Sequence, residues 1–176
     1  MLGECMAGEL KGAKLSIHPC EVTTWEDWRS RHPKTSCLAL SRSFDRYERS
    51  FYRDLSNYVI LYSRLGKAKA WSFDSLRQNP VINDAFAGQQ ILVVFDAEST
   101  LARIYQRNVL GRTLSFEARD GTLRDRETRS LWDLRSLEAS SGLLKGQSLR
   151  PEVGVLANTK AWRSFYPDGI LWQDEP

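Results

Sequence analysis

The fold is decided by the run Gln90-Ile-Leu-Val-Val-Phe95, the strongest strand signal in the chain. The run is apolar and rich in β-branched residues, which favours a buried strand. The alternating segment 67–73 predicts a strand before it, and segments 101–105 and 113–116 follow at hairpin spacing, with a turn signal at 119–121. Short strands and frequent turns predict a β-rich α+β fold, with antiparallel sheets or a partly open barrel and a few short helices.

The composition limits the class of protein. The chain has 176 residues, 41% of them hydrophobic, which suits one domain or two small ones. Its 25 basic and 22 acidic residues leave a net charge of +3, too small to suggest a nucleic-acid-binding protein. No apolar run approaches the ~20 residues that a transmembrane helix needs. No signal peptide is visible, so the residues alone leave the location unknown.

Two parts of the chain repeat one another at a constant offset of 134 positions. The first copy reads Gly8-Glu-Leu-Lys-Gly-Ala-Lys-Leu15 and then Trp28-Arg-Ser-Arg-His-Pro33. The second reads Gly142-Leu-Leu-Lys-Gly-Gln-Ser-Leu149 and then Trp162-Arg-Ser-Phe-Tyr-Pro167. Nine of the 26 positions in 8–33 are identical, whereas about one or two would agree by chance. This recurring tail is expected to be a turn, a strand and a capped helix.

Each copy of the tail predicts a short helix, at about 25–31 and at about 159–165. Thr24 and Asn158 stand at the starts of these helices and are typical N-cap residues. Each helix carries two aromatic residues three positions apart, which share one face and are expected to pack into a core. These pairs are Trp25 with Trp28, and Trp162 with Phe165.

The two copies differ in what precedes them. A long patterned region, residues 67–141, precedes the second copy, and almost nothing precedes the first. We therefore expect residues 1–42 to be the tail of a first repeat unit, 43–65 a linker and 66–176 a complete β-rich unit. Arginines interleave with aromatic residues over 42–54, but acidic residues offset their charge, so a solvated linker is expected there rather than a nucleic-acid-binding segment.

Candidate catalytic residues are few. No His follows residue 32, and the chain lacks the phosphate-binding and nucleophile-elbow motifs. Asp125 and Glu127 would share one face of a strand. With Asp84, they could serve a cation-dependent, hydrolase-like enzyme as acid and base or as cation ligands. We favour a structural interpretation, in which 125–130 forms a charged ladder across strands and Asn83-Asp84 a turn.

The cysteines offer a second alternative. The chain has three, an odd number, and no pair has the C-x-x-C spacing, so partly buried thiols are expected. A thiol or metal site would use Cys20, Cys37 and His18, although their number and spacing match no zinc pattern. The second copy of the tail lacks these residues, so the fold does not need them. Their positions there hold Gly154, Leu171 and Glu152.

Several motifs carry a family resemblance. They are V-I-N-D from Val81, D-R-E-T-x-S-x-W from Asp125, G-x-x-x-G-x-x-L from Gly142, G-E-x-x-A-G from Gly3 and T-W-x-x-W-x-x-x-H-P from Thr24. Together they resemble the domain of unknown function 3179 family, from Gly3 to about Trp172. The resemblance implies no established activity.

The same resemblance has implications for architecture and location. Long members of the family contain two such units, and many are exported or membrane-associated, which implies such a context for this chain. Their first unit carries a C-P-L-C-G segment after the strand that follows the N-D motif. The corresponding place here reads Val94-Phe-Asp-Ala-Glu98, so no role of those cysteines can be carried over.

The function that we predict is non-catalytic: a structural or protein-interaction subunit. A tail without the body that it would normally pack against is expected to pack elsewhere, on its own chain or on a partner chain. That partner would be a second copy or a protein that supplies the missing body. No cofactor and no nucleic acid is expected. The candidate interaction residues are Trp25, Trp28, His32 and Trp162.

Overall fold

The computed structural model describes residues 4–37, 54–119 and 122–173. These residues form several antiparallel sheets and a few short helices, without a closed barrel among them, which confirms the predicted β-rich fold class. No helix within the three described ranges is long and apolar enough to cross a membrane.

The run that decides the fold lies in β4 (Gln89–Asp96), in the middle of a four-stranded sheet. Its neighbours are β3 (Val81–Phe86) and β5 (Leu101–Gln106), and β12 (Pro151–Glu152) pairs with β5 at the edge. All three pairings are antiparallel. The predicted strands at 90–95 and 101–105 are therefore confirmed.

Side chains of β4 alternate between two hydrophobic clusters. Ile91, Val93 and Phe95 belong to one cluster, and Leu92 and Val94 belong to the other. Successive side chains of a strand point to opposite faces, so a strand with a core on each face must be apolar at every position. This explains why the run has no polar interruption.

A second sheet packs over the first of these clusters. Its strand order is β13-β1-β2-β14, and β14 alone runs parallel to its neighbour. The strands are β1 (Tyr58–Arg64), β2 (Lys67–Ser72), β13 (Gly154–Asn158) and β14 (Ile170–Leu171).

β1 corrects the predicted linker, residues 43–65. Residues 58–64 lie between two strands of the sheet, because Tyr-Val-Ile-Leu-Tyr supplies five buried positions in a row. The 3-10 helix η3 (Leu55–Asn57) before β1 also buries Leu55. Residues 43–53 of the expected linker lie outside the described residues.

A third sheet closes the second cluster. It contains β8 (Phe116–Arg119), β9 (Thr122–Asp125), β10 (Leu131–Trp132) and β11 (Ala139–Ser141). The small hairpin of β6 (Asn108–Val109) and β7 (Arg112–Thr113) lies before it in the chain. The strand predicted at 113–116 is thus divided between β7 and β8, because the backbone leaves the strand where Leu114 is buried.

Each of the three helices begins at a capping residue. α1 (Trp25–Arg31), α2 (Phe73–Gln78) and α3 (Thr159–Phe165) each start after a residue whose side chain accepts a backbone hydrogen bond. The expected helices at 25–31 and 159–165, and their caps, are therefore confirmed. The capping residues are Thr24, Ser72 and Asn158.

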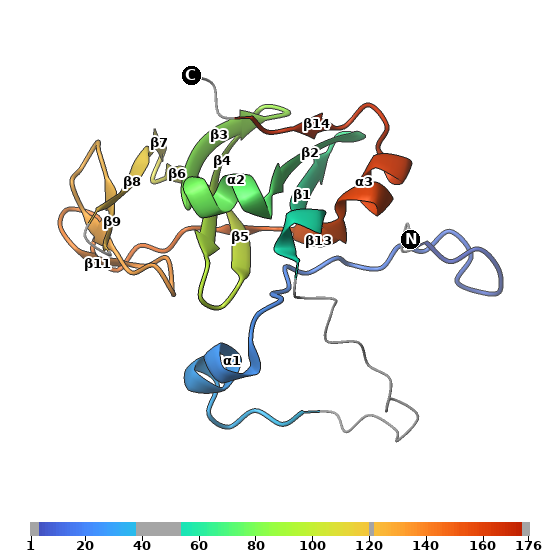
Figure 1. Cartoon of the computed structure of the whole chain (residues 1–176), viewed down its shortest axis with the longest axis horizontal. Coiled ribbons are helices and arrows are strands. Elements are labelled where there is room, and N and C mark those ends of the chain that lie inside the picture. The colour runs from blue at the N-terminus through green and yellow to red at the C-terminus, as the bar shows by residue number, and fades with distance from the viewer. Residues whose placement is uncertain (1–3, 38–53, 120–121, 174–176) are drawn as a thin grey trace.

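The two copies of the tail lie in different surroundings (Figure 1). α3 lies beside β1 and β13, whereas α1 lies below the sheets and is joined to the body by extended chain. The loop of residues 4–14 also projects away from the sheets. The second copy is therefore part of the body and the first is an appendage to it.

Candidate interaction site

Asp125, the first carboxylate of the D-R-E-T-x-S-x-W motif, is completely buried in a structural network. Its carboxylate accepts hydrogen bonds from the Thr128 N–H at 2.6 Å, the Ser130 N–H at 3.1 Å and the Trp132 Nε1–H at 2.9 Å. Buried carboxylates need such donors, because an unpaired buried charge is costly. The carboxylate thereby holds the turn between β9 and β10 in shape.

This network reaches the tail of the second copy. The Thr128 hydroxyl lies 2.8 Å from Asp125 Oδ1, and the Ser130 hydroxyl lies 2.7 Å from the Thr128 hydroxyl. The Leu144 N–H in turn donates to Ser130 Oγ at 3.1 Å. A Cβ at Gly142 would lie 2.7 Å from Ser130 Cα, so only glycine fits there. The D-R-E-T-x-S-x-W motif thus forms a surface on which the G-x-L-K-G-x-x-L stretch packs.

The other two candidate carboxylates have separate structural partners. Glu127 is exposed and accepts a hydrogen bond from the Ser115 N–H, so it does not share a strand face with Asp125. The expected strand face is wrong because β9 ends at Asp125 and residues 126–128 form a turn. Asp84 pairs with Lys69 Nζ at 2.7 Å and lies on β3, not in the expected turn.

The candidate thiol and metal residues are not brought together. Cys20, Cys37 and His18 are all exposed, whereas partly buried thiols were expected. Across residues 4–37, 54–119 and 122–173, no group of three or more His, Cys, Asp or Glu could hold a metal ion. The expected partial burial is thus wrong for Cys20 and Cys37, which lie at the surface, and holds for Cys5.

The turn of the first copy has the same hydrogen bonds as the turn of the second. The bridge between Glu4 and Lys14 recurs as a bridge between Glu138 and Ser148. Four further backbone hydrogen bonds within 5–13 recur within 139–147, each 134 positions later. The glycines of both copies have φ between 83° and 89°. The first turn is therefore fully formed although it lies apart from the body.

The two copies of the turn differ sharply in how far their leucines are buried. Leu144 and Leu149 are each 4% exposed and belong to the second core cluster. Their counterparts, Leu10 and Leu15, are 68% and 72% exposed. The first copy thus displays to solvent the two leucines that the second copy buries.

The helices differ in the same way. Trp162 of α3 is 1% exposed and packs with Val59 and Leu61, whereas α1 buries no residue. Trp28, the counterpart of Trp162, stacks on His32 with ring centroids 4.1 Å apart and remains partly exposed. The expected core packing is confirmed for Trp162, while Trp28 is half-buried. The expectation is wrong for Trp25 and Phe165, which are 52% and 74% exposed.

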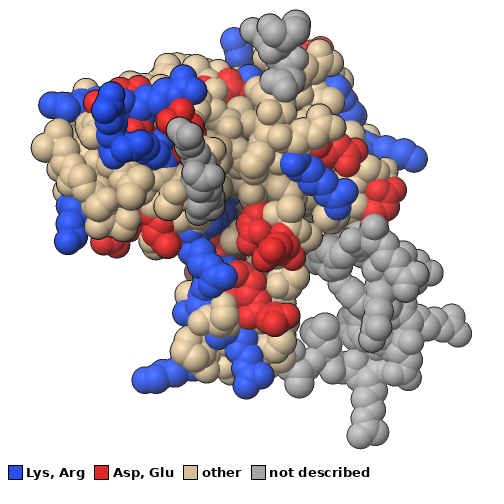
Figure 2. Space-filling model, turned by 60° about the vertical axis from the view of Figure 1, so that its left-hand side comes forward, with Lys and Arg blue, Asp and Glu red and all other residues tan. Residues whose placement is uncertain are grey.

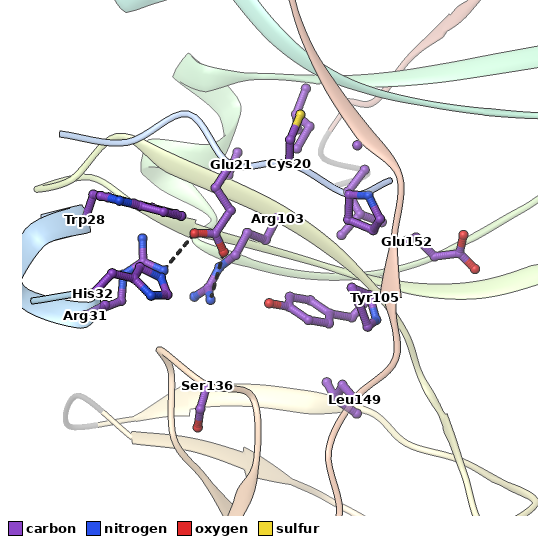
Figure 3. Close-up of a pocket in the computed structure, with 16 residues that line it drawn as sticks. Cys20, Glu21, Trp28, Arg31, His32, Arg103, Tyr105, Ser136, Leu149 and Glu152 are labelled. Carbon is purple, nitrogen blue, oxygen red and sulfur yellow. Dashed lines mark hydrogen bonds and ion pairs between the residues drawn. The ribbon is translucent and has the colours of Figure 1, made fainter. Parts of the chain in front are cut away.

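Polar contacts hold α1 beside the body at the mouth of a cavity of about 640 Å³ (Figure 3). Glu21 accepts from Arg31 Nη1 at 2.7 Å and lies 3.8 Å from Arg103 Nη1 of β5. Arg31 Nη2 also pairs with Asp27 at 2.6 Å. Arg103 also donates from Nη2 to the backbone carbonyl oxygen of Leu134, whereas its buried Nε has no hydrogen-bond partner among the described residues.

The ion pairs keep these groups charged. Burial by itself raises the pKa of Asp27, but hydrogen bonds from Arg31 and Thr23 outweigh it and hold that pKa below its usual value. Burial likewise lowers the pKa of Arg31, but Asp27 and Glu21 raise it overall. Burial raises the pKa of Tyr105, whose ring lies 5.8 Å from the Arg103 guanidinium. Glu21, which precedes α1, thus connects Arg31 of the helix with Arg103 of β5 through charged groups.

Sequence reasoning missed Leu10 and Leu15 as candidate interaction residues. Both were present in the repeat, but the repeat alone did not reveal that one copy is buried and the other exposed. It also missed Glu21 and Arg103, because ion pairs between distant segments leave no local pattern. Basic and acidic side chains are mixed on the face that Figure 2 shows, as the balanced composition predicts.

Comparison with known families agrees with the motifs. Residues 1–169 match the family described as "Protein of unknown function (DUF3179)". Neither the curated proteins nor the solved structures contain a match to the chain. Because the family match covers nearly all of the sequence, the resemblance of its motifs is confirmed, and the chain belongs to the DUF3179 family.

Proposed function

We propose that this chain is a non-catalytic interaction subunit, and that residues 4–37 are a docking segment for a protein surface. The observation that carries this proposal is the exposure of Leu10 and Leu15 on a turn that is already formed. Exposed apolar side chains on a preformed element are typical of protein interfaces, because little conformational entropy is lost on binding.

The remaining apolar residues of the docking segment support the same function. Met6 and Ile17 flank the turn at 82% and 69% exposure, and Trp25 projects from α1. Aromatic and long apolar side chains dominate the energy of protein interfaces. In the second copy, the equivalent stretch binds its own body through Leu144, Leu149 and Trp162.

The repeat arrangement belongs to the same proposal. We infer that the docking segment is the tail of a first repeat unit and that the residues from 54 onward form a complete second unit. The shared turn geometry supports a duplicated tail, and the inclusion of β1 in the sheet supports a start of the complete unit before residue 58.

No observation on the described residues favours the enzymatic or the metal-binding alternative. Asp125, Glu127 and Asp84 each have a structural partner, and the cysteine and histidine candidates are dispersed over the surface. An interaction role also agrees with the charged groups of the cavity being paired within the chain.

The proposed function can be tested by site-specific cross-linking. A photo-reactive amino acid placed at position 10 or 15 is expected to yield an intermolecular product of defined mass in the native cells. The matched controls are positions 65 and 110, which hold equally exposed leucines outside the docking segment. Products from 65 and 110 alone, or only intrachain products from 10 and 15, would overturn the proposal.

A further inference from the structure

The second copy shows what covers the leucines of this kind of turn. Leu144 and Leu149 lie in a cluster built from β4, β5 and the third sheet, and the Leu144 N–H donates to Ser130 Oγ. Gly142 lies directly against Ser130, where a side chain would collide with the backbone. The covering surface is therefore a body of this fold that carries the D-R-E-T-x-S-x-W loop.

Between 8 and 15, the first copy retains the glycines and leucines of the second copy's turn. Its glycines and leucines occupy the same positions, and its backbone forms the same turn. Between 8–15 and 142–149 the sequences differ at only three positions, and none of the three is buried in the second copy. Those three positions are Leu143, Gln147 and Ser148, which correspond to Glu9, Ala13 and Lys14.

The chain after the turn supports the same partner. In the second copy, residues 151–152 and 154–158 form β12 and β13, which pair with β5 and β1. In the first copy, residues 17–24 are extended and form no strand. An extended segment of this kind can complete a sheet by adding its backbone at an open edge.

We propose that the partner of the docking segment is a second body of this same fold whose own tail position is empty. Leu10 and Leu15 would enter its core, the Leu10 N–H would donate to the serine of its D-R-E-T-x-S-x-W loop, and residues 17–24 would add strands to its sheets. This inference rests on the proposed function and names its partner.

An identical chain in its native state does not meet these conditions. Its tail position is filled by residues 138–158 of the same chain. In addition, Cys20 corresponds to Gly154, where a Cβ would lie 2.8 Å from Ile60 Cδ1. The accepting body therefore has a free tail position and more room beside the residue that corresponds to Ile60.

A graft within the full chain tests whether the first copy can cover such a body. The triple variant Leu143→Glu/Gln147→Ala/Ser148→Lys gives residues 142–149 the sequence of 8–15. We expect its melting temperature to stay within about 3 °C of the wild type, because no buried side chain changes. The matched control, Leu144→Asp/Leu149→Asp, is expected to lower it by more than ~10 °C or to prevent folding. If the triple variant behaves like that control, the inference is overturned.

Identification of the cross-linked partner tests the inference directly. The product formed at position 10 is digested, and the peptide attached to it is sequenced. A peptide from a body with a D-R-E-T-x-S-x-W loop in a separate chain supports the inference, whereas a peptide from the same chain overturns it together with the proposed function. A partner without this loop overturns the inference but leaves the proposed function standing, whereas no cross-link at all removes both.

Discussion

The sequence makes Asp125 a candidate catalytic residue, whereas in the fold its side chain has a structural role. Its carboxylate satisfies two backbone N–H groups and the indole of Trp132, all within a turn of eight residues. The short local hydrogen bonds explain the motif, because Asp side chains commonly organise the turn that follows them. What the motif maintains is the surface on which Leu144 rests.

Replacing this carboxylate should destabilise the protein. Asp125→Asn puts an amide N–H₂ where a carboxylate oxygen accepts hydrogen bonds, so at least one buried donor loses its partner. We expect a loss of about 2–4 kcal/mol in the free energy of unfolding, measured by urea denaturation. Glu127→Gln is the matched control and should change it by less than ~0.5 kcal/mol, because Glu127 is exposed and Gln retains an acceptor oxygen. Equal stability of Asp125→Asn and wild type would contradict the structural role.

At the scale of elements, the helices could be predicted from the sequence because their determinants are local. Thr24 and Asn158 cap their helices through hydrogen bonds to residues two or three positions ahead. The strand β4 could likewise be predicted from its apolar, β-branched composition. The pairing of β1 with β13 could not be predicted, since its partners lie about a hundred positions apart. The sequence predicts a strand where a turn follows Asp125, because alternating polar residues are compatible with either structure. The hydrogen bonds to the Asp125 carboxylate distinguish the turn from a strand.

The two turns offer a matched pair of substitutions. Leu144→Ala removes buried side-chain volume and should cost about 2–4 kcal/mol of unfolding free energy in urea denaturation. Leu10→Ala, at the same place in the exposed turn, should change it by less than ~0.5 kcal/mol. A similar cost at both positions would mean that the first turn is packed against the body in solution.

The stability of α1 should depend on pH. The folded-state pKa of Asp27 lies below the ordinary aspartate value of 3.8, so its ion pair with Arg31, four positions along the same helix, stabilises α1 above that pH. This contribution is lost as the pH falls below 3.8 and through the lowered pKa. The protection of the α1 amides, expressed relative to the intrinsic exchange rate at each pH, should therefore fall under acid conditions before the sheets unfold. Asp27→Asn should show fast exchange already at neutral pH, and an unchanged rate in that variant would contradict the ion-pair account.

At the scale of the whole molecule, the chain combines a packed body with an N-terminal segment whose turn is formed but whose apolar side chains are exposed. No backbone hydrogen bond joins residues 15–22 to any other described part of the chain, whereas the corresponding stretch 149–156 pairs with β5 and β1. Local stability therefore differs strongly between two stretches that correspond in sequence.

Hydrogen exchange measured by mass spectrometry should display this contrast in the isolated chain. Amides of residues 15–22 are expected to exchange within seconds, and those of 154–158 to be slowed by at least about a thousandfold, because opening them requires breaking the sheet. Peptides from β12 and β4 provide internal references. Comparable protection of both stretches would indicate that the docking segment is already covered.

The lysines of the exposed turn have a consequence for solubility. Lys11 and Lys14 stand beside Leu10 and Leu15, and all four are exposed in the free turn. Charged residues next to apolar ones discourage non-specific aggregation. In the second copy, Lys145 and Ser148 occupy the positions of the two lysines and are exposed even though the neighbouring leucines are buried. The lysines can therefore protect the free segment from aggregation, and in the proposed complex they would remain hydrated.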